Sequence, residues 1–212
     1  MPVEMIGWIA PRIASELIPP SGPPFDPDVL AETARIHERA GFDRVLIGYF
    51  SGAPDGFLVG AHAASATERL GFLLAHRPGF VAPPVAARKL ATLDQLTNGR
   101  LAVHIIAGGS DADQAKDGDW TDHATRYRRS TEYVSLLRRT WTEPAPFDHD
   151  GEFYQTRGTF FGNSLPAGSA YPDLRRWWLR RCNPGARSAC RCLHAVGRAA
   201  EKYGPLYGPR AG

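Results

Sequence analysis

The chain has 212 residues, of which 43% are hydrophobic and 22% are charged, and this length suits one domain with a full core. It contains no run of about 18 apolar residues, so a membrane-spanning helix is not expected. The acidic N-terminal segment does not have the pattern of a signal peptide, and we expect a cytoplasmic protein.

The net charge of +3 is unevenly distributed along the chain. Residues 1–170 carry 16 Lys and Arg against 20 Asp and Glu, whereas residues 171–212 carry 9 basic residues against Asp173 and Glu201. All three cysteines also lie in this basic segment, and the spacing of Cys190 and Cys192 without a second pair does not predict a zinc site. The change in composition predicts a boundary between residues 1–160 and a tail of residues 161–212.

Short apolar runs alternate with longer amphipathic segments along residues 1–142. The expected elements, in chain order, are strand Ile6–Ala10, helix Pro27–Ala40, strand Arg44–Gly48, helix Phe57–Arg69, strand Gly71–His76, helix Pro83–Thr97, strand Leu101–Ala107 and helix His123–Trp141. Strands that are apolar on both faces and alternate with helices predict a parallel sheet covered by helices. The pattern fits a barrel or an open sheet, but the lack of G-x-G-x-x-G after the first strand favours the barrel. Because a (β/α)8 TIM barrel typically has about 250 residues, we expect its N-terminal half, with four to five βα units.

His104 is the polar side chain of an otherwise apolar strand. Alternation places it on one face with Ala102 and Ile106, near the carboxyl end where barrel active sites lie. It could therefore bind a ligand, although a core histidine bonded to a backbone carbonyl is the interpretation that composition alone favours.

His123, Arg126 and Tyr127 begin the last predicted helix. A helix N-terminus with a guanidinium and a phenol is suited to binding phosphate, but Arg126 could equally be solvated while Tyr127 faces the core. The preceding Gly108-Gly109-Ser110 could contact an anion or form only a turn. The aspartates between residues 111 and 122 lack EF-hand spacing and are interpreted as a solvated loop.

Several motifs occur in a characteristic order. They are Ala75-His76-Arg77-Pro78, residues 85–94, Asn98-Gly99-Arg100, Asp122-His123 with Arg126-Tyr127, and residues 146–154. Together they resemble the bacterial luciferase-like flavin-dependent monooxygenases, close to the alkanesulfonate and dimethylsulfone monooxygenase branch, over residues 4–160.

The resemblance implies a (β/α)8 barrel that binds reduced FMN, supplied by a separate NAD(P)H-dependent FMN reductase, and that uses O2 to oxygenate a small organosulfur substrate. It also implies a homo-oligomer. The implied cofactor contacts are His104 at the flavin ring, His123, Arg126 and Tyr127 at the ribityl phosphate, and Tyr49, Ala75 and His76 lining the flavin or substrate pocket. Ala53 stands where alkanesulfonate monooxygenases have a cysteine, which shifts the expected substrate away from a strict alkanesulfonate. A deazaflavin-dependent oxidoreductase of the same superfamily and a non-catalytic basic protein are the alternatives.

The tail does not continue the family pattern. Trp177-Trp178 must be encoded TGGTGG, which reads Gly-Gly when shifted by one base, and the following shifted codon permits serine. The family has a Gly-Gly-Ser loop in its second half, so we interpret residues from about 161 onward as a frameshifted translation. A genuine basic tail that binds an anionic partner is the alternative. An open half barrel would expose strand edges, and we expect poor solubility and no activity without a complementary half.

Overall fold

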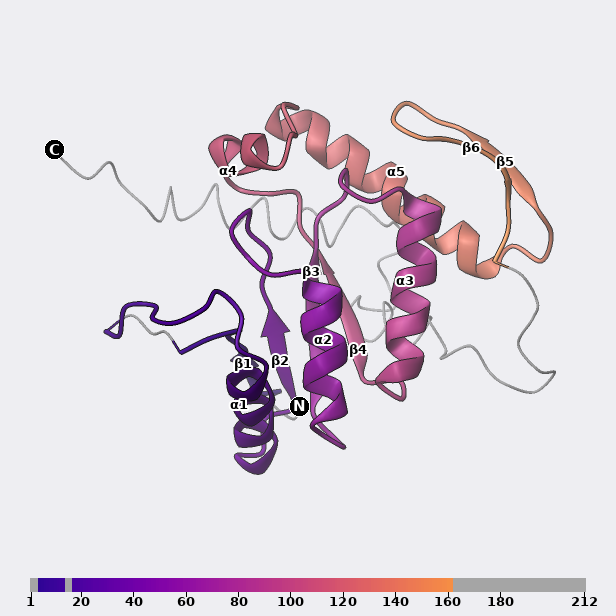
Figure 1. The fold of residues 1–212 in the computed structure, drawn as a ribbon. Coiled ribbons are helices and arrows are strands. Elements are labelled where there is room, and N and C mark those ends of the chain that lie inside the picture. Colours follow the sequence, from indigo (N-terminus) through magenta and orange to yellow (C-terminus); the bar gives the residue numbers. More distant parts are fainter. Residues whose placement is uncertain (1–3, 14–16, 162–212) are drawn as a thin grey trace, which may run out of the picture. The chain divides into compact units, whose positions relative to one another are not determined.

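The computed structural model describes residues 4–13 and 17–161 (Figure 1). The predicted basic tail, with Trp177-Trp178 and the cysteines, lies outside the described residues. Among the residues described, no helix has the length and apolar character needed to cross a membrane.

Four strands form one parallel sheet in the sequential order β1-β2-β3-β4. They are β1 (Ile6–Trp8), β2 (Arg44–Ile47), β3 (Gly71–His76) and β4 (Leu101–Ile105). Each strand pairs with its successor in the chain. The parallel sheet predicted from the sequence is confirmed, and this strand order is the one that a TIM barrel shows along its first half.

The four predicted helices are present as α1 (Pro27–Arg39), α2 (Gly56–Ser65), α3 (Pro83–Leu96) and α5 (His123–Thr142). Three of them begin after an aspartate whose side chain accepts backbone N–H groups of the first turn, as an N-cap does. Helix α2 ends four residues earlier than predicted. The reason is Glu38, whose carboxylate accepts hydrogen bonds from the N–H groups of residues 68–70 at 3.0, 2.5 and 2.9 Å and so holds them outside the helix.

The hydrophobic core lies between the sheet and these helices. Val45, Ile47, Phe72, Leu74 and Leu101 are all buried and alternate along the strands, so they share the covered face. Helix α2 packs directly on this face, because a Cβ at Gly56 would contact Leu74 and a Cβ at Gly60 would contact Ile47. The order of the strands and the helices around them can be followed in Figure 1.

The opposite face of the sheet is more open. Trp8 of β1 is 55% exposed, and Leu46 of β2 and Leu73 of β3 are half-buried in the same row across the sheet. The indole of Trp8 lies over Gly48, where an added Cβ would be 2.5 Å from the ring. In a closed barrel this face is the interior, and its carboxyl end is where active sites form.

Three elements were not predicted from the sequence. The short helix α4 (Asp111–Lys116) follows β4, and β5 (Phe147–Asp150) pairs antiparallel with β6 (Gln155–Thr159). Ser110 is the N-cap of helix α4, because its hydroxyl accepts a hydrogen bond from the N–H of Asp113. The interpretation of the aspartates between residues 111 and 122 as a solvated loop is therefore wrong for residues 111–116, whereas residues 117–122 lie in neither a helix nor a strand.

Candidate functional site

Ala75 and His104 lie side by side on the open face of the sheet. They are direct register partners between β3 and β4, near the carboxyl ends of both strands. The methyl group of Ala75 is buried, whereas the imidazole of His104 is exposed. Ala102 lies two residues before His104 on the same face, so small side chains flank the imidazole.

His76 projects to the other side of the sheet from Ala75. It is 3% exposed, and the edge of Phe57 faces its ring from α2 at a centroid distance of 5.6 Å. Its Nε2 is hydrogen-bonded to the hydroxyl of Tyr133 on α5, at 2.6 Å. Burial lowers the pKa of His76 to about 4, and Lys89 contributes to the shift. The structure therefore does not bring His76 together with Ala75 and His104.

Arg126 is buried beneath the loop that joins β4 to α5. Its guanidinium donates to the carbonyl oxygens of Ala107 (3.0 Å) and Thr121 (2.5 Å) and to the carboxylate of Asp111 (2.7 Å). In addition, the carboxylate of Asp122 caps α5 by accepting the N–H of Thr125 at 3.0 Å. The guanidinium and the helix N-terminus, both expected to bind phosphate, thus already have acidic partners within the chain.

His123 and Tyr127 remain accessible at the start of α5. Their rings meet edge to face with centroids 4.8 Å apart, one turn from each other on the same side of the helix. His123 is exposed and Tyr127 is half-buried, so both can reach a ligand. A phosphate contact by this pair stays a prediction.

Two further acidic residues of this region form ion pairs with arginines from other elements. Asp113 pairs with Arg77 at 2.9 Å, and Asp119 pairs with Arg129 of α5. The hydrogen bonds from Arg129 and Thr121 lower the pKa of Asp119 to about 2, against the opposing effect of burial. The sequence analysis missed these ion pairs because it assigned no basic partner to the aspartates. The position of Arg77 directly after a buried strand could have indicated a buried ion pair.

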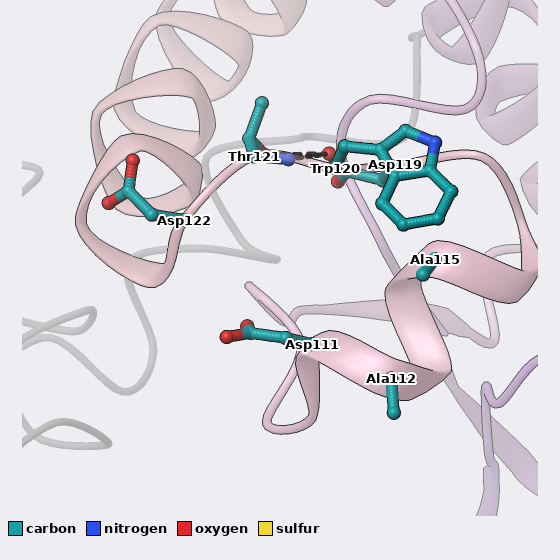
Figure 2. A pocket seen from close by; sticks show the side chains of 7 residues that line it. All are labelled: Asp111, Ala112, Ala115, Asp119, Trp120, Thr121 and Asp122. Carbon is teal, nitrogen blue, oxygen red and sulfur yellow. Dashed lines mark hydrogen bonds between the residues drawn. The ribbon is translucent and has the colours of Figure 1, made fainter.

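A pocket of about 400 Å³ lies between α4 and the segment that leads into α5. Figure 2 shows the exposed indole of Trp120 and the carboxylates of Asp111 and Asp122 around it. Three carboxylates and no basic side chain occur among its lining residues, so it is not suited to an anion such as phosphate.

The residues on the open face fit part of a flavin. An exposed imidazole beside Ala75, with the Trp8 indole on the same face of the sheet, offers a polar group and apolar groups for contact with a ligand. The described residues contain no group of three or more His, Cys, Asp or Glu side chains that could hold a metal ion.

Comparison with known families identifies the lineage. A model of the luciferase-like monooxygenase family matches residues 4–170. The chain belongs to this family. The family's TIM-barrel fold agrees with the four sequential parallel strands, and its members include flavin-dependent monooxygenases.

Solved structures show the same fold. EDTA monooxygenase from Chelativorans sp. BNC1 is 17% identical in sequence and superposes with a TM-score of 0.65. The match covers 74% of this chain and 45% of the EDTA monooxygenase chain. The oxygenating constituent of 3,6-diketocamphane monooxygenase from Pseudomonas putida, in complex with FMN, is 20% identical with a TM-score of 0.60, covering 74% and 44%. An F420-dependent secondary alcohol dehydrogenase is 20% identical with a TM-score of 0.62, covering 76% and 48%. The chain thus spans about half the length of the solved structures that it matches.

Proposed function

We propose that this luciferase-like monooxygenase chain contributes the first half of a site for reduced FMN. The observation that carries the proposal is the pair Ala75 and His104, which lie side by side at the carboxyl end of the open sheet face. His104 would contact the flavin ring, and His123 with Tyr127 would lie toward the phosphate. When bound, reduced FMN supplies the reaction with O2, and the protein binds and orients it.

The proposed reaction is the oxygenation of a small organic substrate, with reduced FMN supplied by a separate NAD(P)H-dependent reductase. An organosulfur substrate is our proposal from the sequence resemblance, with Ala53 disfavouring a strict alkanesulfonate. Homo-oligomerisation is proposed on the same basis. The remaining part of the barrel would add further contacts to the flavin, so we expect this chain alone to bind FMN more weakly than a closed barrel would.

A deazaflavin is the second candidate cofactor, because a structure of comparable similarity is F420-dependent. Titration of the 212-residue chain with FMN and with the deazaflavin, followed by tryptophan fluorescence, distinguishes them. We expect FMN to bind more tightly and His104→Ala to weaken FMN binding about tenfold. His62→Ala, a change on α2 away from the open face, is the matched control. Preferential deazaflavin binding, or equal FMN binding by His104→Ala and the native chain, would contradict the proposal.

We also propose that the tail is read in a shifted frame, which is supported by the basic composition of residues 171–212 and by the Trp177-Trp178 codons. Because the family match continues to residue 170, the proposed shift lies between about residue 161 and Trp177. Sequencing the gene through codons 155–185 tests this. A +1 frame without a continuing family sequence rules it out, and the frame-restored protein allows organosulfur substrates to be assayed.

A further inference from the structure

Arg77 contacts two aromatic rings that come from two different loops. It follows the last residue of β3, and its side chain is 4% exposed. The guanidinium carbon is 4.4 Å from the ring centroid of Tyr49, in the loop after β2, and 5.8 Å from that of Phe80, in the loop after β3. The two rings are nearly parallel, at 14°, with centroids 6.1 Å apart. Such contacts are favourable when the cation is desolvated.

The same guanidinium reaches the region after β4. It donates to Asp113 at 2.9 Å and lies 3.6 Å from the carboxylate of Asp117. The other oxygen of Asp113 accepts hydrogen bonds from the backbone N–H of Ser51 at 3.2 Å and from its hydroxyl at 2.6 Å. One buried arginine therefore connects the segments that follow β2, β3 and β4.

An apolar side chain could fill this space without the penalty of burying a charge. That penalty is present here, because Nε and Nη1 of Arg77 are buried without a hydrogen-bond partner. Unlike an apolar side chain, the guanidinium can contact both aromatic rings and pair with the two aspartates at the same time. These three segments follow the carboxyl ends of β2, β3 and β4, and Ala75 and His104 lie near the carboxyl ends of β3 and β4.

We propose that Arg77 is a positioning residue for the cofactor site, which acts by holding Tyr49 and the Ser51–Asp113 connection in place. This inference rests on the proposed flavin function. Sites held by side chains of this kind lose binding when the supporting contact is removed, even where the ligand is not touched.

The test compares FMN dissociation constants for Arg77→Met, Arg77→Lys, Tyr49→Leu and the double variant Arg77→Met with Tyr49→Leu. We expect a roughly tenfold weaker affinity for Arg77→Met and a smaller loss for Arg77→Lys. If Arg77 acts through Tyr49, the FMN dissociation constant of the double variant should be about equal to that of whichever single variant binds FMN less tightly. Fully additive losses, or unchanged binding by Arg77→Met, overturn the inference. Arg44→Met is the control, because it removes an ion pair with Glu4 at the amino-terminal end of β2, whereas Arg77 follows the carboxyl end of β3.

A second measurement needs no flavin. Hydrogen exchange of the Ser51 amide should become faster in Arg77→Met and in the milder Asp113→Asn, but not in Arg44→Met. Unchanged Ser51 exchange in both variants overturns the role of Arg77. Failure of the native chain to bind either cofactor instead refutes the proposed function, and with it the cofactor role of Arg77, while the exchange data still report the loop coupling.

Discussion

A hydrogen bond 2.6 Å long joins Nε2 of His76 to the hydroxyl of Tyr133, across the interface between β3 and α5. Both side chains are buried, and burial also raises the pKa of Tyr133. This pair connects the end of the sheet to the longest of the helices in the described residues. It makes His76 a structural residue whose protonation acts on folding.

Acid should destabilise the protein through His76. Its pKa is about 4 in the folded chain and 6.5 in the reference state, so the unfolded chain binds more protons between these values. The contribution of neutral His76 to the free energy of unfolding is therefore fully present above pH 6.5. It falls by up to about 3 kcal/mol as the pH drops toward 4. The free energy of unfolding, measured with urea, should differ less between pH 7.5 and pH 5 for His76→Gln than for the native chain. Exposed His123, changed to Gln, should leave the difference as it is.

Asp94→Asn should stabilise the protein at neutral pH. The side chain of Asp94 is fully buried, neither carboxylate oxygen has a hydrogen-bond partner that meets normal geometry, and burial raises its pKa to about 6. Because the folded pKa exceeds the reference value of 3.8, the charge costs stability as the pH rises through 6. The gain should be about 3 kcal/mol at pH 8 and should disappear near pH 4. A gain of equal size at both pH values would show that charge is not the cause.

Glu132→Ala should loosen the β5–β6 hairpin from α5. The carboxylate of Glu132 accepts the N–H groups of Phe153 and Tyr154, both at 3.0 Å, and contacts His149 at 3.0 Å. Its loss leaves partly buried donors unpaired, so we expect about 1–3 kcal/mol of destabilisation and faster amide exchange at residues 153 and 154. Glu152→Ala removes an exposed pair with Arg128 and should change stability by less than about 1 kcal/mol. Equal losses for the two variants would contradict this account.

Gly108→Ala should be destabilising, whereas Gly109→Ala should not. Gly108 has a φ of +82°, and a Cβ there would lie 2.0 Å from the buried amide of Gln114. A Cβ at Gly109 would meet no atom within 4 Å, and its φ is not in the left-handed region. Thermal unfolding should place Gly108→Ala about 1–3 kcal/mol below the native chain and Gly109→Ala within about 1 kcal/mol. Similar unfolding of the two variants would show that the loop relaxes freely.

Local patterns in the sequence were sufficient for the parallel sheet and its four main helices. Apolar strands and amphipathic helices are properties of short segments, so they can be predicted without knowing the fold. The β5–β6 hairpin was missed because Phe147–Asp150 carries mostly polar residues, and its position depends on Glu132, a residue distant in sequence. Helix α4 was missed because its aspartates pair with Arg77, which follows β3, and with Arg126 of α5.

The candidate site, like the fold, combines features that the sequence predicted with features that only the tertiary structure decided. The sequence by itself identified the family motifs and the face of the strand on which His104 lies, because alternation along one strand is local. Only the tertiary structure decided that Ala75 is its partner, that His76 faces the helices, and that Arg126 and Arg77 are bound to aspartates. Strand register and ion pairing depend on residues brought together from distant parts of the chain, and no single segment contains that information.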